Sequence, residues 1–232
     1  FNEKNYPDFD YGDLNDRLLG LFRVWNAVEY YFPYLDLMDE NWHDLLPEYI
    51  SQMLNANDRH SYDLILASMT TKLRDPHVSF TDTESITEEL GEYLIPVNLM
   101  MIEGYPVVVD IFSEDCQLQI GDSIRKLNGQ EIWEVIEGRQ KYISTSTDEK
   151  VRSMVLNDYL LTSHEQMMEI IVLRDGKEQT FEVKGYTRQE VYGQIREIAS
   201  KKKIITSKIL EENIGYIQMG TLTEENINET MD

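Results

Sequence analysis

The sequence is poor in cysteine, in basic residues and in long hydrophobic runs. Its single cysteine, Cys116, can form neither an internal disulfide nor a zinc cluster, so neither holds this chain together. Only 21 residues are Lys or Arg against 43 Asp or Glu, and the formal net charge of −22 argues against binding to nucleic-acid phosphates or to anionic lipid. No run of about 18 apolar residues occurs, so we expect no insertion into a membrane.

Glycine and proline are also few, and aromatic residues are plentiful. The chain has 12 Gly, 6 Pro and 41% hydrophobic residues, a composition typical of a folded globular protein rather than a disordered one. A length of 232 residues predicts one or two domains. Because the chain starts at Phe1 and not at Met, we expect a trimmed or mature chain from which any targeting segment is gone.

The first third of the chain has helical periodicity. Apolar residues recur at three- and four-residue spacing from Leu14 until Phe32-Pro33, where the proline disfavours helix in the residue before it. The same spacing predicts helices over 42–54 and 61–73, the latter with Ser61 as its N-cap. We therefore expect an N-terminal three-helix bundle within a domain of residues 1–90, with an acidic linker or loop over 81–92.

Strand signals dominate the middle of the chain. Two turn dipeptides, Glu103-Gly104 and Asp175-Gly176, each separate two apolar runs and predict two hairpins, and Asn128-Gly129 ends a further strand. A helix is predicted over 147–161. The strands are expected at 96–101, 105–112, 122–127, 168–173 and 179–183. Residues 91–187 thus read as a compact α+β domain.

The last segment, 188–232, has a different pattern. Apolar spacing predicts a connecting helix over 188–203 with a basic C-terminal end, where cations are favoured. Two strands are expected at 204–210 and 214–219, followed by a polar, acidic stretch.

Three motifs resemble one protein family. Residues 118–129, with Gly121-Asp122, Ile124 and Asn128-Gly129, resemble the Gly-Asp-x-Ile-x-x-Ile-Asn-Gly stretch of bacterial PDZ domains. The three-residue spacing of Ile124 and Leu127 predicts a strand that is buried on both faces or bulged.

Two further motifs flank that PDZ-like stretch. Residues 73–80, which contain Asp75-Pro76-His77, resemble the Leu-x-Asp-x-His-(Thr/Ser) motif of the tail-specific, or C-terminal processing, serine peptidases and their tricorn-core relatives. Residues 213–220 resemble the Asn-Ile-Gly-Tyr-Ile-x-x-Gly strand that opens the catalytic domain in that family. The resemblance implies an α+β chain: the helical bundle, a PDZ-like domain and the first strands of a truncated catalytic domain.

In the resembled family the catalytic serine follows on a later strand-to-helix turn. The resemblance therefore implies the N-terminal substrate-recognition or regulatory part of a serine endopeptidase, inactive by itself. In the tricorn-like branch the residue corresponding to His77 is the general base, whereas in the tail-specific branch a lysine does that work and the histidine is structural. Asp75 either holds His77 or belongs to the helix-end turn, and Pro76 matches the tail-specific branch. The branch stays open, as does simple packing of His77 at the helix end.

By the same resemblance, a peptide is expected to add as an extra strand in a PDZ groove. The carboxylate-binding loop is expected at Leu94, Ile95, Pro96 and Val97, although Pro96 has no N–H to donate. Val151, Met154 and Val155 are expected to line the opposite wall. The alternative is that all seven side chains belong to the core.

No metal or cofactor motif occurs. The histidines are scattered, and neither a His-Glu-x-x-His pattern nor a phosphate-binding Gly-x-x-x-x-Gly-Lys-Ser/Thr loop is present. We expect protein or peptide substrates as partners, no cofactor and no nucleic acid. The resemblance suggests a periplasmic or secreted protein of the bacterial cell envelope. The competing interpretation is a non-catalytic peptide-binding adaptor.

Overall fold

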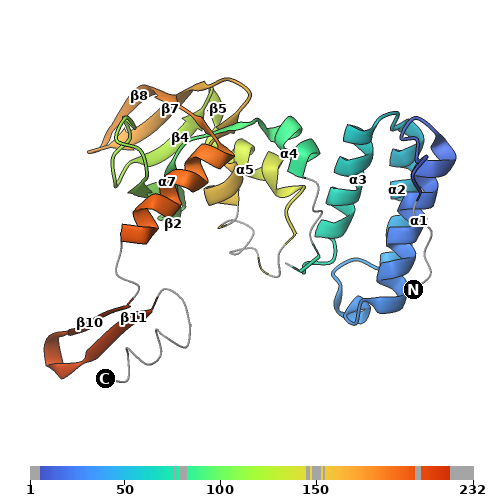
Figure 1. The fold of residues 1–232 in the computed structure, drawn as a ribbon, viewed down its shortest axis with the longest axis horizontal. Coiled ribbons are helices and arrows are strands. Elements are labelled where there is room, and N and C mark those ends of the chain that lie inside the picture. Colours follow the sequence, from blue (N-terminus) through green and yellow to red (C-terminus); the bar gives the residue numbers. More distant parts are fainter. Residues whose placement is uncertain are drawn as a thin grey trace. The chain divides into compact units, whose positions relative to one another are not determined.

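The computed structural model describes residues 6–75, 77–78, 83–144, 147, 153, 155–201 and 205–219. It is an α+β structure that divides into two compact units, Phe1–Arg188 and Gln189–Asp232 (Figure 1). The first unit has two separate hydrophobic cores, one among its N-terminal helices and one around a sheet.

The N-terminal helices form where the apolar spacing predicts them. α1 (Leu14–Tyr31) ends at Phe32, α2 is Trp42–Asn55 and α3 is Arg59–Thr71, with a short 3-10 turn η1 (Leu35–Leu37) between the first two. All three helices contribute to one core, for example through Leu21, Met53 and Met69, which are fully buried. Trp25 and Trp42 stack with ring centroids 6.4 Å apart, and each indole N–H donates to the other's carbonyl.

Two local predictions about this region are wrong. Asp58, and not Ser61, is the N-cap of α3, because its carboxylate accepts the Ser61 N–H at 2.8 Å. Part of the expected loop over 81–92 is a helix, α4 (Thr83–Leu90). Its Ser85 hydroxyl donates to the buried Asp63 carboxylate of α3, and Ile86 is buried. Tertiary contacts therefore stabilise this helix, although its acidic, polar sequence does not predict one.

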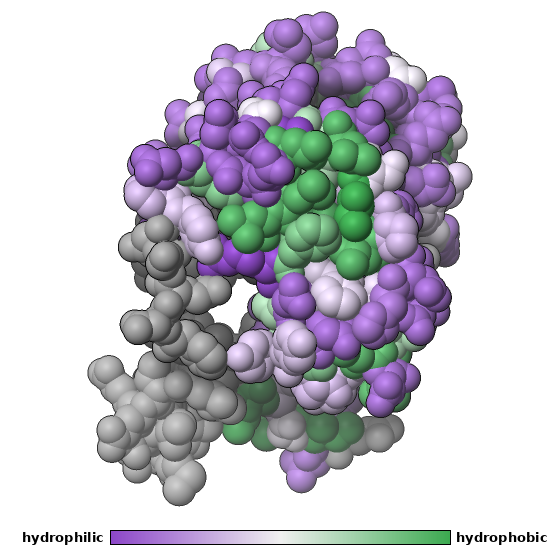
Figure 2. All heavy atoms as spheres, turned by 90° about the vertical axis from the view of Figure 1, so that its right-hand side faces the viewer, coloured by the Kyte–Doolittle hydropathy of each residue, from purple (hydrophilic) through white to green (hydrophobic). Residues whose placement is uncertain are grey.

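The exterior of α1 and α2 is not uniformly polar. Figure 2 looks at the side of the molecule where these helices lie and shows an apolar patch framed by hydrophilic side chains. Large apolar side chains exposed on the two helices include Leu14, Phe22 and Leu54.

The second core lies under an antiparallel sheet. The strand order is β2-β3-β4-β7-β8, with β5 paired to β4, so β2 and β8 are the edges. The strands are β2 (Val97–Ile102), β3 (Tyr105–Ile111), β4 (Ser123–Leu127), β5 (Gln130–Glu131), β7 (Met167–Arg174) and β8 (Lys177–Lys184). A second small sheet joins β1 (Tyr93–Leu94), β6 (Thr162–Ser163) and β9 (Tyr186–Thr187).

The turn dipeptides act as predicted. Glu103-Gly104, Asn128-Gly129 and Asp175-Gly176 all have positive φ at both residues, which fits the hairpin turns that match strand twist. Gly121 has φ +97° ahead of β4, a value that side-chain-bearing residues rarely adopt. The register of β4 against β7 shifts between Ile124 and Lys126, so the predicted bulge buries both Ile124 and Leu127.

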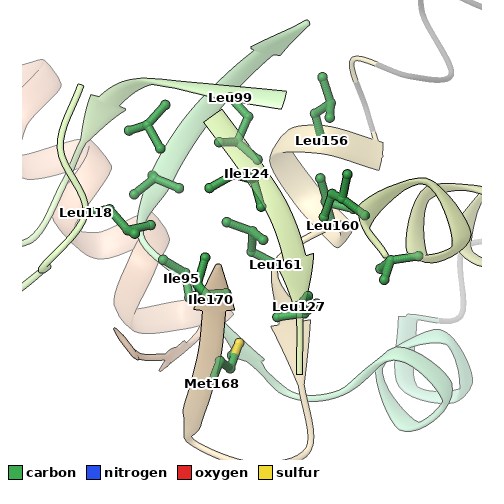
Figure 3. Packing of buried hydrophobic residues seen from close by; sticks show 14 of the residues in the cluster. Ile95, Leu99, Leu118, Ile124, Leu127, Leu156, Leu160, Leu161, Met168 and Ile170 are labelled. Carbon is green, nitrogen blue, oxygen red and sulfur yellow. The ribbon is translucent and has the colours of Figure 1, made fainter. Parts of the chain in front are cut away.

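Helical segments cover the core of this sheet. α5 (Ile132–Gln140), which the sequence analysis did not predict, and the short π-helical segment η2 (Val155–Tyr159) both contribute buried residues to it. Figure 3 shows Leu156, Leu160 and Leu161 packed toward Leu99 and Ile124 of the strands. Of the helix predicted over 147–161, the structure describes mainly η2.

The second unit is small. α7 (Arg188–Lys201) begins at the boundary between the units, and β10 (Ile205–Ile209) and β11 (Gly215–Met219) follow it. β10 and β11 pair antiparallel around a 3-10 turn, η3 (Glu211–Asn213), as the two predicted strands suggest. In the described part of the chain, no helix is long and apolar enough to cross a membrane.

Candidate functional site

A groove opens beside the edge strand β2. Its volume is about 570 Å³, which is within the range of ligand-binding pockets. The groove is lined by Asn98, Leu99, Met100, Met101, Gly104, Val109, Trp133, Ser153, Leu156 and Asn157. The lining is mainly apolar, and an edge strand carries backbone groups that its own sheet does not use. The groove can therefore accept an extended segment with apolar side chains.

One polar side chain engages the edge of β2. The Leu99 N–H donates to Asn157 Oδ1 at 2.9 Å, so this amide group points away from β3 and toward η2. The Asn157 Nδ2 in turn donates to the Ser153 carbonyl at 3.0 Å. The Asn157 carboxamide thus accepts the Leu99 N–H, the same group that would donate to the carbonyl of a strand added beside β2.

Five of the seven residues predicted to face a peptide are buried in this structure. Leu94, Ile95, Pro96, Val97 and Val155 all have little exposed surface, which fits the alternative that they belong to the core. Backbone N–H groups of the proposed carboxylate loop are also in use: Ile95 donates to the Leu161 carbonyl at 3.0 Å and Val97 to the Ile95 carbonyl at 2.9 Å. Val151 and Met154 lie outside the described residues.

The wall of the groove is fixed by two arginines. Arg139 of α5 donates to the Tyr159 carbonyl at 2.6 Å and to the Thr162 carbonyl at 3.0 Å, and Arg188 donates to the Asp158 carbonyl at 2.7 Å. Carbonyls at a helix C-terminus lack intrahelical partners and attract cations. Burial, together with the neighbouring Arg188 charge, lowers the pKa of Arg139 to about 10. The two guanidinium groups therefore hold the end of η2, and with it Asn157, against the sheet.

A buried ion pair stabilises the Gly121-Asp122 turn. Asp122 accepts from Arg174 Nε and Nη2, both at 2.6 Å, and its side chain is fully buried. It also accepts the Gln119 N–H at 2.7 Å. The Asp122 carboxylate raises the pKa of Arg174. The motif aspartate therefore has a structural role in ordering the start of β4.

His77 lies on the turn that follows α3. Arg74 has φ +49°, an unusual value for a residue with a side chain, and it redirects the chain after the helix. The Asp75 carboxylate accepts the His77 backbone N–H at 2.8 Å and lies 3.0 Å from His77 Nδ1. The backbone hydrogen bond, ahead of the ring contact, lowers the pKa of Asp75. Asp75 is thus a turn residue whose carboxylate also contacts the His77 ring.

The His77 ring lies in solvent beside the Asp75 carboxylate. The His77 side chain is 92% exposed. Nδ1 faces Asp75, so Nε2 is the ring nitrogen left for another group. No described residue bonds to Nε2, and no hydroxyl or thiol of the described residues bonds to the ring. The Asp75 contact therefore fixes which ring nitrogen of His77 faces the turn.

The turn is anchored to the sheet region. The Ser144 hydroxyl, which follows α5, lies 2.9 Å from the Asp75 carbonyl and 3.2 Å from the Thr70 carbonyl. This contact connects the segment after α5 with the turn that carries His77. Sequence reasoning did not find Ser144, since its partners lie about 70 residues away in the chain.

The described residues contain no cluster of three or more His, Cys, Asp or Glu side chains that could hold a metal ion. The only cysteine is partly buried, and burial raises the pKa of the Cys116 thiol. A high thiol pKa disfavours the reactive thiolate.

Comparison with known proteins finds similarity at the level of structure. No family model and no curated protein sequence matches the chain. Among solved structures, mature CPAF has a TM-score of 0.56 at 12% identity over 88% of this chain and 46% of its own. A serine-to-alanine mutant of CPAF has a TM-score of 0.56 at 11% identity, and mature CPAF complexed with lactacystin has 0.54 at 11%.

These values show a shared fold. At 11–12% identity the similarity concerns the fold alone, which this chain shares with part of the CPAF structures. The chain spans a little under half the length of the solved structures that it matches, with 47% coverage of the mutant and of the lactacystin complex.

Proposed function

We propose that this chain is the substrate-recognition part of a serine endopeptidase and that it contributes His77 as the general base. The observation that carries the proposal is the structural similarity to CPAF over 88% of the chain. The family resemblance of residues 73–80 and 118–129 supports the same assignment independently of the fold comparison. The catalytic serine and the oxyanion donors would come from a part of the protease fold that has no counterpart among these residues.

In this proposal, residues 1–90 are the helical domain, 91–187 are a PDZ-like domain and 188–232 begin the catalytic domain. The PDZ-like domain would bind a substrate segment as an added strand beside β2. The edge position of β2 and the apolar groove support this mode of binding. Backbone groups would provide affinity, and the pocket would select apolar side chains.

The proposed chemistry uses both atoms of the His77 ring that can hold a proton. A serine hydroxyl is a weak nucleophile at neutral pH and needs a base within hydrogen-bond reach. The serine oxygen attacks the scissile carbonyl carbon while its proton moves to Nε2 of His77. The same proton then passes to the leaving amine as the carbon–nitrogen bond breaks, and water later releases the acyl group. Asp75 would hold Nδ1–H and stabilise the imidazolium.

The contact of 3.0 Å between Asp75 and His77 favours the branch that uses histidine as its base over the branch that uses lysine. A structural histidine at a helix end would need no carboxylate on its ring. The proposed substrates are proteins or peptides, and the family resemblance suggests a location in the bacterial cell envelope.

A non-catalytic adaptor is the second candidate. It is favoured by one observation, the groove of about 570 Å³ that described residues of this chain line beside β2. An adaptor would bind peptides at β2 and would have no use for the His77 base.

The test compares the full-length protein encoded by the gene with this 232-residue chain. We expect the full-length protein to cleave an unfolded protein substrate, and a serine-directed inhibitor to abolish the cleavage. The 232-residue chain should bind peptides without cleaving them. Inhibitor-sensitive turnover by the short chain, or an inert full-length protein that still binds peptides, would contradict the assignment, and the second result would favour the adaptor.

A further inference from the structure

A second pocket lies against the turn that carries His77. It has a volume of about 560 Å³ and is formed by the end of α1, the η1 region and the end of α3. Its apolar lining consists of Phe32, Tyr34, Leu37, Met38 and Leu73. His77 itself lines the pocket.

The pocket exists because the chain turns sharply after α1. Pro33 ends the helix at Phe32, and the 3-10 turn then presents the side chains on either side of it. The Phe32 and Tyr34 rings pack edge to face with centroids 5.8 Å apart, which holds one rim of the pocket. Tyr34 is 56% exposed and Leu37 is 78% exposed. These large apolar groups therefore have surface left to bury.

The charged groups of the pocket neutralise one another. Arg74 Nη1 lies 2.6 Å from the Asp39 carboxylate, and Lys72 Nζ lies 2.6 Å from the Glu40 carboxylate. The glutamate raises the pKa of Lys72 through that hydrogen bond. The Asp75 carboxylate faces the His77 ring. A charged side chain that entered the pocket would lose hydration and would have to compete with ion pairs already made.

We propose that this pocket binds an apolar or aromatic side chain of the substrate next to the scissile bond. This inference rests on the proposed role of His77 and adds a specificity site to it. A base must lie within about 3 Å of the reacting hydroxyl, so the scissile bond must come close to His77. An extended chain advances about 3.3–3.6 Å per residue, so a residue next to that bond lies near enough to place its side chain in a pocket lined by His77.

The test measures kcat/KM of the full-length protein on peptides that differ at one position beside the cleaved bond. The peptides carry Phe, Leu, Gly or Asp there. We expect a preference for Phe and Leu over Gly and Asp. Truncation of the rim in the double variant Tyr34→Ala/Leu37→Ala should lower the ratio of kcat/KM for Phe over Gly by about tenfold, the scale of lost contacts in an apolar specificity pocket.

The matched control is Leu54→Ala. Leu54 is a leucine of α2 that is 56% exposed, like Tyr34, but it does not line the pocket. Its removal should leave the Phe over Gly ratio unchanged, and circular dichroism should show that both variants fold as the wild type does.

The outcomes separate the inference from the proposed function. An unchanged Phe over Gly ratio in Tyr34→Ala/Leu37→Ala, with His77→Ala still inactive, overturns the pocket assignment and leaves the peptidase role intact. A preference for Asp over Phe in the wild type also overturns it. Full activity of His77→Ala, or no cleavage by the wild type, overturns both.

Discussion

Replacement of Asn157 should make the β2 groove a better peptide binder. In the free protein the Leu99 N–H already has an acceptor, Asn157 Oδ1 at 2.9 Å. A peptide that adds as a strand beside β2 must offer its own carbonyl to that N–H, and the asparagine must then leave. The bond that is lost contributes about 0.5–1.5 kcal/mol net. Since a factor of ten corresponds to about 1.4 kcal/mol, Asn157→Ala should bind a strand-forming peptide between about twofold and about twelvefold more tightly.

Asn157→Asp is the matched variant, because it keeps the shape and an acceptor oxygen for the Leu99 N–H and gives up only the donor to the Ser153 carbonyl. A carboxylate forms a stronger, charge-assisted bond to the Leu99 N–H, so this variant should bind the peptide more weakly than the wild type. Fluorescence anisotropy with a labelled peptide of alternating apolar residues measures all three dissociation constants on the 232-residue chain. Equal affinities, or weaker binding by Asn157→Ala at an unchanged melting temperature, would refute the competition of Asn157 with the peptide.

Two further predictions concern stability and reactivity. Asp122→Asn removes the carboxylate that pairs with Arg174, whose side chain is only 15% exposed. The free energy of unfolding, measured in urea, should therefore fall by about 3–5 kcal/mol. A loss below about 1 kcal/mol would show that solvent screens the pair. Burial raises the pKa of the Cys116 thiol, so iodoacetamide at mildly alkaline pH should alkylate Cys116 more slowly in the folded chain than in urea. The difference in rate should shrink as the pH rises above the pKa of the folded state. Equal rates would contradict the burial of the thiol.

Local sequence signals predicted most of the elements. The end of α1 at Pro33 and the turns at Glu103-Gly104 and Asp175-Gly176 are encoded by the residues at those positions, so they could be predicted without tertiary information. α4 could not, since its helix depends on contacts such as the Ser85 hydroxyl with Asp63. α5 was missed because its apolar residues Ile132, Val135 and Ile136 form too short a pattern.

The candidate site divides in the same way. His77 and Asp75 are two residues apart, and their contact follows from a local turn, so a motif could identify them. The groove joins residues that are far apart in the chain, as Leu99 and Asn157 are. The family resemblance placed Val155 on a groove wall, with a core position as the alternative. A resemblance of this kind does not distinguish the two, and Val155 is fully buried.

The general-base role of His77 is the central claim, and one measurement tests it most directly: kcat/KM of the full-length protein and its His77→Ala variant on a protein substrate, with the melting temperature of both. Loss of a general base lowers the rate by about 10²- to 10⁴-fold. Because the His77 side chain is 92% exposed, its removal should leave the melting temperature nearly unchanged. A large loss of activity at constant stability is the predicted result. A stable variant with wild-type activity would contradict the assignment of His77 as the base.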